Sequence, residues 1–236
     1  MKLAFPLRRL PLAALFVFAA SAQAQSFLFD FGNPATTADP LNFWNNVTDA
    51  IGLSDTGQLL DLVTTTNTVS TIDLFMVARF NGLNGNGTTT SSVYPATATG
   101  DSFFGNTETF GIGPNIFPVF RLASLDPSKT YDFTFYASRT GVTDIRETLY
   151  TVTGQSVSTT TLNVANNQND VATIFSVSPS ATGEINIALT PGPANNNANH
   201  FTYLGVLKVD TIPEPSTAVA MLLGGAGLFS RRRRTS

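Results

Sequence analysis

The chain has no cysteine and only one histidine among its 236 residues. The absence of cysteine excludes disulfides, thiol catalysis and cysteine-based metal sites. The single histidine, His200, therefore has no cysteine partners for a zinc site, and we interpret it as structural or solvent-exposed. A domain of the 187 residues from 25 to 211 is long enough to bury a core without disulfides.

Basic residues are scarce in this central region. Residues 25–211 carry six lysines and arginines against fifteen acidic residues, so their net charge is near −9. Nucleic acids and anionic lipid surfaces are bound by clustered lysine and arginine. The composition therefore excludes both classes of partner and suits an exported domain that functions in water.

The remaining cationic residues lie at the two ends of the chain. At the N-terminus, Lys2, Arg8 and Arg9 precede an apolar run over residues 10–20. Ala22 and Ala24 then form a small-x-small cleavage site. This order is typical of a secretory signal peptide. We predict a signal helix within residues 1–24, cleavage after Ala24, and the Sec export machinery as a partner.

At the C-terminus, three features follow one another. Pro213, Glu214 and Pro215 come first, and the two prolines favour an extended, exposed backbone. Residues 216–230 then contain no charge, and as a helix they would span about 22 Å, less than the ~30 Å hydrocarbon core. Four arginines follow and act as a cytoplasmic stop by the positive-inside rule: Arg231, Arg232, Arg233 and Arg234. We predict a short transmembrane helix at residues 216–230.

This order of proline motif, apolar segment and arginine stop resembles the PEP-CTERM sorting signal. The resemblance covers about a tenth of the chain. It implies that an exosortase cuts at Pro213, Glu214 and Pro215, next to Ser216, and passes the protein to the cell surface or extracellular matrix. The precursor would be anchored transiently in the inner membrane. We thus divide the chain into a signal peptide (1–24), one cargo domain (25–211) and a sorting signal (212–236).

The cargo domain shows the two-residue periodicity of β-strands. Phe27, Phe29 and Phe31 share one face of the first predicted strand, and similar alternation recurs at residues 74–80, 130–138, 184–189 and 201–209. Turn signals separate short strands with almost no helical pattern between them, which predicts an all-β antiparallel β-sandwich, specifically a jelly roll. We expect one short helix, at residues 42–51. Two polar stretches, 81–102 and 191–199, are predicted as long loops.

Three segments carry a second resemblance, to the galactose-binding-like sandwiches of secreted bacterial proteins. They are residues 101–106, 125–135 and 146–154. The resemblance covers about half of the cargo domain and implies its fold. It brings no catalytic motif.

The catalytic motifs in the cargo domain are incomplete. Gly100, Asp101 and Ser102 resemble the nucleophile block of GDSL-type esterases, but Asn197 stands where the partner block of that family has its aspartate before the histidine. We therefore interpret Ser102 as a loop residue. Glycoside hydrolysis needs two paired carboxylates, and the sequence alone pairs none. We interpret Asp144, Arg146 and Glu147, together with Arg139, as a cross-strand charge cluster.

Two stretches carry residues that suit ligand binding. Trp44 stands beside Asn45 and Asn46, an arrangement in which the ring stacks on a sugar while the amides bind hydroxyl groups; the alternative is that Trp44 fills the core. Arg139 is a further candidate. The asparagine-rich stretch 166–170 offers the oxygen atoms that calcium prefers, but it lacks the loop of an EF-hand, and we interpret it as a polar turn. We predict no metal and no cofactor.

Together these features predict an exported, non-enzymatic protein of the cell surface or biofilm matrix with a structural or adhesive role. The first alternative is a carbohydrate-binding module for exopolysaccharide, which predicts exposed aromatic rings beside Asn and Asp in one groove. The second is a glycan-active or ester hydrolase, which predicts two carboxylates about 5–10 Å apart in a cleft.

Overall fold

The computed structural model of the chain describes residues 24–33, 43–111, 113–114 and 117–212. Their strands form three sheets. The five-stranded sheet has the order β11 (Ala172–Val177), β8 (Thr130–Tyr136), β14 (Val206–Ile212), β1 (Ser26–Phe31) and β2 (Trp44–Val47). The six-stranded sheet has the order β10 (Val157–Asn163), β9 (Glu147–Thr153), β12 (Ile185–Pro191), β7 (Val119–Ala123), β4 (Asp73–Ala78) and β3 (Gln58–Leu59). The third sheet contains β13 (Thr202–Leu204), β6 (Ser102–Gly105) and β5 (Gly82–Asn84).

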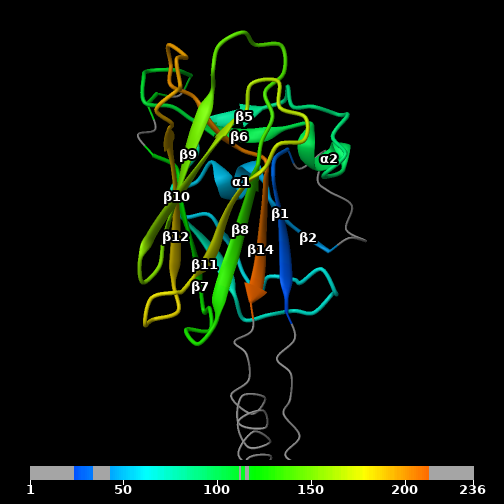
Figure 1. The fold of residues 1–236 in the computed structure, drawn as a ribbon, viewed down its shortest axis with the longest axis vertical. Coiled ribbons are helices and arrows are strands. Elements are labelled where there is room, and N and C mark those ends of the chain that lie inside the picture. Colours follow the sequence, from blue (N-terminus) through cyan, green and yellow to red (C-terminus); the bar gives the residue numbers. More distant parts are fainter. Residues whose placement is uncertain (1–23, 34–42, 112, 115–116, 213–236) are drawn as a thin grey trace, which may run out of the picture. The chain divides into compact units, whose positions relative to one another are not determined.

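The five- and six-stranded sheets pack face to face through aromatic side chains. Phe135 of β8 stacks on Tyr150 of β9 with ring centroids 4.3 Å apart, and Phe31 of β1 lies 5.2 Å from Phe120 of β7. All four rings are fully buried. The predicted common face of Phe27, Phe29 and Phe31 is confirmed, since all three side chains belong to this core. The prediction of an all-β sandwich is therefore confirmed (Figure 1).

The sheets are antiparallel apart from the pairing of β1 with β2, which is parallel. This pair corrects the helix expected at residues 42–51. Residues 44–47 form a strand in which Trp44 lies opposite Leu28, and only the four residues of α1 (Asp49–Gly52) are helical. Short apolar runs can form either a helix or a strand. Here residues 44–47 form a strand because the edge of β1 offers backbone groups for pairing.

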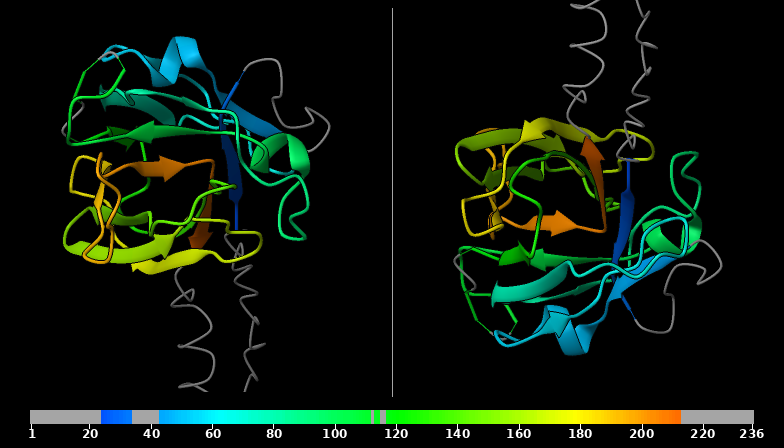
Figure 2. Two further views of the ribbon diagram at one scale, coloured as in Figure 1. Left: turned by 90° about the horizontal axis from the view of Figure 1, so that it is seen from above. Right: turned by 90° about the horizontal axis from the view of Figure 1, so that it is seen from below.

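The stretch 81–102, expected to be one long loop, contains two elements. They are β5 and the helix α2 (Ala96–Thr99). With β6 and β13, β5 makes the small third sheet, which lies across one end of the sandwich (Figures 1 and 2). Phe103 of β6 is fully buried and packs 5.6 Å from Phe80, so the third sheet closes that end of the core.

The alternating run at residues 201–209 is divided between two sheets at Gly205. The Gly205 N–H donates to Tyr136, and its carbonyl accepts from Phe31. A Cβ at this position would lie 3.1 Å from the carbonyl oxygen of Asp101, so a residue without a side chain allows the close approach. As a result Tyr203 lies in β13 of the third sheet, whereas Leu207 and Val209 lie in β14 of the five-stranded sheet. All three side chains belong to the hydrophobic core.

The described chain enters and leaves the sandwich at the same end. The Thr211 N–H donates to the Gln25 carbonyl at 2.7 Å, and β1 pairs antiparallel with β14. Gly205, which joins β14 to the third sheet, lies at the other end of β14. The third sheet therefore lies at the end of the sandwich opposite to the start of β1 and the end of β14 (Figure 1).

The predicted export and sorting segments lie outside the described residues. This applies to the signal helix with Ala22, to Pro213, Glu214, Pro215 and Ser216, and to the arginines at 231–234. Among the residues that the structure describes, no helix is both long and apolar enough to cross a membrane. The transmembrane helix at 216–230 stays a prediction.

Candidate functional site

A cavity of about 310 Å³ opens at the end of the sandwich that the third sheet covers. We call it the aromatic pocket. Its walls come from β5 and the turn after it, from β6 and the segment that follows, from the segments before β9, and from the start of β13. It is lined by Leu83, Asn84, Gly85, Asn86, Phe104, Phe110, Arg139, Arg146, Phe201 and Tyr203.

Three phenylalanine rings of the pocket support one another edge to face. Phe201 lies 5.2 Å from Phe104 and 4.8 Å from Phe110, with interplanar angles of 86° and 89°. Phe201 is only 7% exposed, whereas Phe110 is 43% exposed. The backbone carbonyl of Phe110 accepts a hydrogen bond from the side chain of Asn81, which is buried. The pocket thus presents one aromatic ring to solvent and holds it in place from behind.

Arg146 lies between the rings and an acidic partner. Its guanidinium carbon is 5.3 Å from the Phe201 centroid and 5.9 Å from that of Tyr203. Its Nε donates to Asp144 at 3.0 Å, one Nη donates to the Tyr203 hydroxyl, and Asn197 donates to the other Asp144 oxygen. Arg146 is thereby fixed in position and its charge is compensated.

The pKa values in this network follow from burial and from these contacts. Burial raises the pKa of Tyr203, although the positive charges of Arg146 and Arg139 oppose the effect. Partial burial acts to raise the pKa of Asp144, but hydrogen bonds from Arg146 and Asn197 outweigh it and lower the pKa below 3.8. Burial acts to lower the pKa of Arg146, and its bonds to Asp144 and Tyr203 reverse the direction. At neutral pH the network holds an ion pair and a neutral phenol.

Arg139 differs from Arg146 in having no acidic partner among the described residues. One Nη donates to the Thr140 carbonyl at 2.6 Å. The N–H and hydroxyl of Thr140 both donate to the Asn86 carbonyl, which ties the two loops on this side of the pocket together. The loops place the Arg139 guanidinium and the Asn86 amide beside the same opening.

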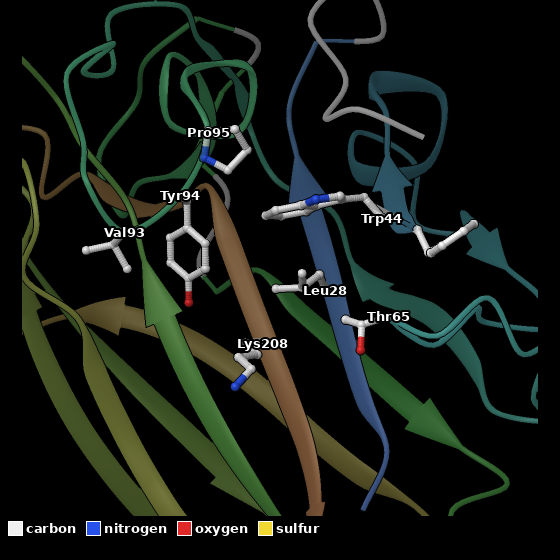
Figure 3. A pocket seen from close by; sticks show the side chains of 8 residues that line it. Leu28, Trp44, Thr65, Val93, Tyr94, Pro95 and Lys208 are labelled. Atoms are coloured by element: carbon white, nitrogen blue, oxygen red, sulfur yellow. The ribbon is translucent and has the colours of Figure 1, made fainter. Parts of the chain in front are cut away.

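A second cavity, of about 580 Å³, lies on the outer face of the five-stranded sheet around Trp44. Figure 3 shows the Trp44 ring above Leu28 on β1, with Tyr94 facing it and Lys208 below. Trp44 is only 8% exposed and packs with Ala98, Tyr136 and Val206 in a small cluster. The Lys208 ammonium lies 2.8 Å from Asp210, so its charge is compensated. We call this the Trp44 cavity.

The structure does not bring the four predicted ligand-binding residues into one site. Trp44 lines the Trp44 cavity and Arg139 lines the aromatic pocket. Asn45 is buried, where its amide donates to the carbonyls of Leu28 and Val63 and accepts from the Val63 N–H. Asn46 follows on β2 and is partly buried. Their part in ligand binding stays a prediction.

Sequence reasoning missed the aromatic residues that line the pocket. Phe104 stands within the segment 101–106, which was interpreted only through its resemblance to galactose-binding-like sandwiches. Phe201 begins the run 201–209 and was interpreted only as a strand residue. Phe110 lies in a segment with no regular pattern. The one sequence feature that could have indicated these residues is the number of phenylalanines near residue 104, namely Phe103, Phe104 and Phe110.

The esterase alternative meets a geometric obstacle. Ser102 is fully buried and accepts a hydrogen bond from Asn84. Thr202 pairs with Gly105, so His200 lies beyond the end of β6 that is farther from Ser102. The His200 ring instead faces Glu108 at 3.7 Å. These two residues therefore do not form a nucleophile and base pair.

The asparagine-rich stretch 166–170 is a polar turn held by its own side chains. Asn167 donates to the carbonyls of Ala137 and Asp170 and accepts from the Asp170 N–H. Asn166 donates to Val142 and accepts from Gly141. The amide groups therefore fasten this turn to the neighbouring loop.

Comparison with known proteins adds a motif at the C-terminus. Residues 211–234 match the PEP-CTERM protein-sorting motif. The chain therefore carries an exosortase sorting signal and is an exported protein that is anchored transiently in the membrane. No curated protein matches the chain in sequence.

The solved structures that match the chain share little sequence with it. The ANX1 ectodomain from Arabidopsis thaliana is 12% identical with a TM-score of 0.45, over 80% of this chain and 48% of that one. An exo-β-1,3-galactanase from Phanerochaete chrysosporium, solved with galactose, is 16% identical with a TM-score of 0.28, over 63% of this chain and 31% of that one. The chain spans about half the length of the ANX1 ectodomain.

Proposed function

We propose that the sandwich is a non-enzymatic adhesive domain that holds an extracellular polysaccharide in the aromatic pocket. The protein that carries it is sorted by an exosortase to the cell surface or the extracellular matrix. The observation that supports this function is the solvent-exposed ring of Phe110, braced by Phe104 and Phe201 beside two arginines and an asparagine. This is the grouping of exposed aromatic and amide residues that distinguishes a sugar site from a purely structural protein.

The chemistry of the pocket suits a sugar. The C–H face of a pyranose packs on an aromatic ring, and its hydroxyl groups need donors and acceptors fixed at the rim. The side-chain amide of Asn86 makes no hydrogen bond to any of the described residues, and Arg139 has further N–H donors. The apolar ring of Phe110 and the polar groups of Asn86 and Arg139 thus line one opening.

The place of the pocket also suits a tethered adhesin. The pocket lies at the end of the sandwich that the third sheet covers, while the chain leaves β14 at Ile212 on the opposite end. The sorting motif begins there, at residue 211. A protein held at its C-terminal side would present the pocket on the side away from the attachment point.

Calorimetric titration of the domain of residues 25–212 with a panel of polysaccharide fragments tests this function. We expect binding to at least one polymer, and we expect the Phe110→Ala variant to bind it about tenfold more weakly. The matched control is Phe175→Ala, because Phe175 is 70% exposed on β11 and lines no part of the pocket. Equal losses in both variants, or binding to no polymer, would contradict the proposal and leave a structural matrix role.

The sorting part of the proposal has a separate test. Replacing Pro213, Glu214 and Pro215 by alanine removes the motif but keeps the apolar segment and the arginines. We expect the variant to stay in the inner membrane fraction while the wild type reaches the surface or medium. Unchanged delivery of the variant would show that this motif is not the address.

A further inference from the structure

The charge of the aromatic pocket differs from that of the domain around it. Residues 25–211 carry six cationic and fifteen acidic side chains, yet two of the six cations line this single pocket. None of the described aspartates and glutamates lines it. We propose that the ligand is a carboxylated polysaccharide, in which the carboxylate of a uronate sugar binds Arg139. This inference rests on the proposed function and names the substrate class of that site.

The two arginines have different tasks. Arg146 is only 12% exposed, and its charge is already matched by Asp144. Arg139 is partly exposed and has no carboxylate partner among the described residues. Arg139 and Arg146 both line the pocket, together with Tyr203. Two positive charges and one negative charge leave the pocket with one uncompensated cation.

The guanidinium group of Arg139 is positioned so that it can bind an anionic ligand. The Arg139 Nη1 bond to Thr140 uses one donor of a guanidinium that has five. The remaining donors form a planar fork that matches the two oxygens of a carboxylate. The Thr140 bonds to the Asn86 carbonyl fix the loop that carries the fork.

A uronate residue combines the two features that the pocket offers. Its pyranose ring has an apolar face for Phe110, and its carboxylate is a single anion for Arg139. General attraction cannot supply this binding, because the domain is acidic as a whole and repels polyanions. Selectivity for the carboxylate must therefore come from the pocket itself.

The test compares polygalacturonate oligosaccharides with the same oligosaccharides after full methyl esterification, titrated into the domain of residues 25–212. The hydrophobic core that the described residues form lies entirely within this range. The two ligands share their backbone and differ only at the carboxyl group, which is an anion in one and a neutral methyl ester in the other. Neutral galactan and dextran oligosaccharides form a third arm, and the variants are Arg139→Gln and Arg121→Gln. Arg121 is the matched control, because it pairs with Glu184 at 3.1 Å and does not line the pocket.

We expect the free oligouronate to bind about tenfold more tightly than its methyl ester, and Arg139→Gln to remove that difference while Arg121→Gln keeps it. Equal binding of acid, ester and neutral sugars would overturn the uronate inference and leave the proposed function intact. A preference that survives in Arg139→Gln would also overturn the inference. Binding of none of these sugars would overturn the inference, and failure of the whole polysaccharide panel would overturn the proposed function as well.

Discussion

The aromatic pocket and the Trp44 cavity both contain aromatic rings next to a cation, but the rings and cations are held differently. In the Trp44 cavity the tryptophan is 8% exposed and Lys208 is paired with Asp210. In the aromatic pocket Phe110 is 43% exposed and Arg139 has no acidic partner among the described residues. In the larger cavity the ring and the cation are therefore engaged in contacts within the protein. In the smaller cavity the ring is open to solvent and the cation has no acidic partner among the described residues. A candidate binding site thus differs from a cavity lined by packed core residues in the exposure of its rings and in charged groups that lack an acidic partner. Residue type and cavity volume do not separate the two.

The largest effect that this comparison predicts is on stability, at Trp44. Trp44→Ala removes a large buried ring from the cluster with Tyr136 and Val206 and should lower the free energy of unfolding by about 3 kcal/mol. Polysaccharide binding by the folded fraction should stay unchanged. Urea unfolding and calorimetric titration measure the two quantities. If Trp44→Ala lost binding while keeping its stability, the assignment of the two cavities would be reversed.

Arg146→Ala should affect both stability and binding. The change leaves Asp144 without its partner and removes the contacts to Phe201 and Tyr203, so we expect a loss of about 2 kcal/mol in unfolding free energy. Binding should fall below detection because the back wall of the pocket is lost. Arg121→Ala, which breaks an exposed ion pair, should cost less than about 1 kcal/mol and leave binding intact.

A smaller change sharpens the contrast between the two aromatic sites. Phe110→Trp enlarges the exposed ring, so we expect a few-fold gain in affinity for the polysaccharide with no change in stability. The same titration measures it. An unchanged affinity would indicate that the sugar does not pack on residue 110.

The smallest effect is the pH dependence of the Asp144 ion pair. Its pKa in the folded protein is lower than 3.8, so its stabilising contribution is present above pH 3.8 and is lost as pH falls through the folded-state pKa. Wild type should therefore be more stable than Asp144→Asn at pH 6, and the difference should shrink at pH 3. A difference that is constant with pH would show that the charge of Asp144 does not contribute.

The parts of the fold that could be predicted were those set by local periodicity. The common face of Phe27, Phe29 and Phe31 and the strands near residues 130–136 and 185–189 follow from alternation alone. The strand at Trp44 could not be found this way, because its four residues are specified by the free edge of β1. The third sheet also escaped prediction, since β5 has three residues within a polar stretch and β13 was joined to β14 in one alternating run.

The site could be predicted only in part for the same reason. Arg139 was singled out, and it lines the pocket, but its aromatic partners come from segments distant in sequence. Phe110, Arg139 and Phe201 meet only because the third sheet crosses the end of the sandwich. No local sequence pattern predicts that these three residues lie close together. The sorting signal, in contrast, is a linear motif, so its resemblance to PEP-CTERM signals could be seen at residues 212–236 from the order of the residues, and the match at residues 211–234 confirms it.

The most direct test of the central claim uses nuclear magnetic resonance, with the single tryptophan and the arginines as reporters. Trp44 gives one indole N–H signal, and Arg139 and Arg146 each give a side-chain Nε–H signal. During titration with the polysaccharide that binds best, we predict shifts of the two arginine signals while the indole signal stays in place. A shift of the Trp44 indole without any change at Arg139 and Arg146 would contradict the account and place the ligand on the other face of the domain.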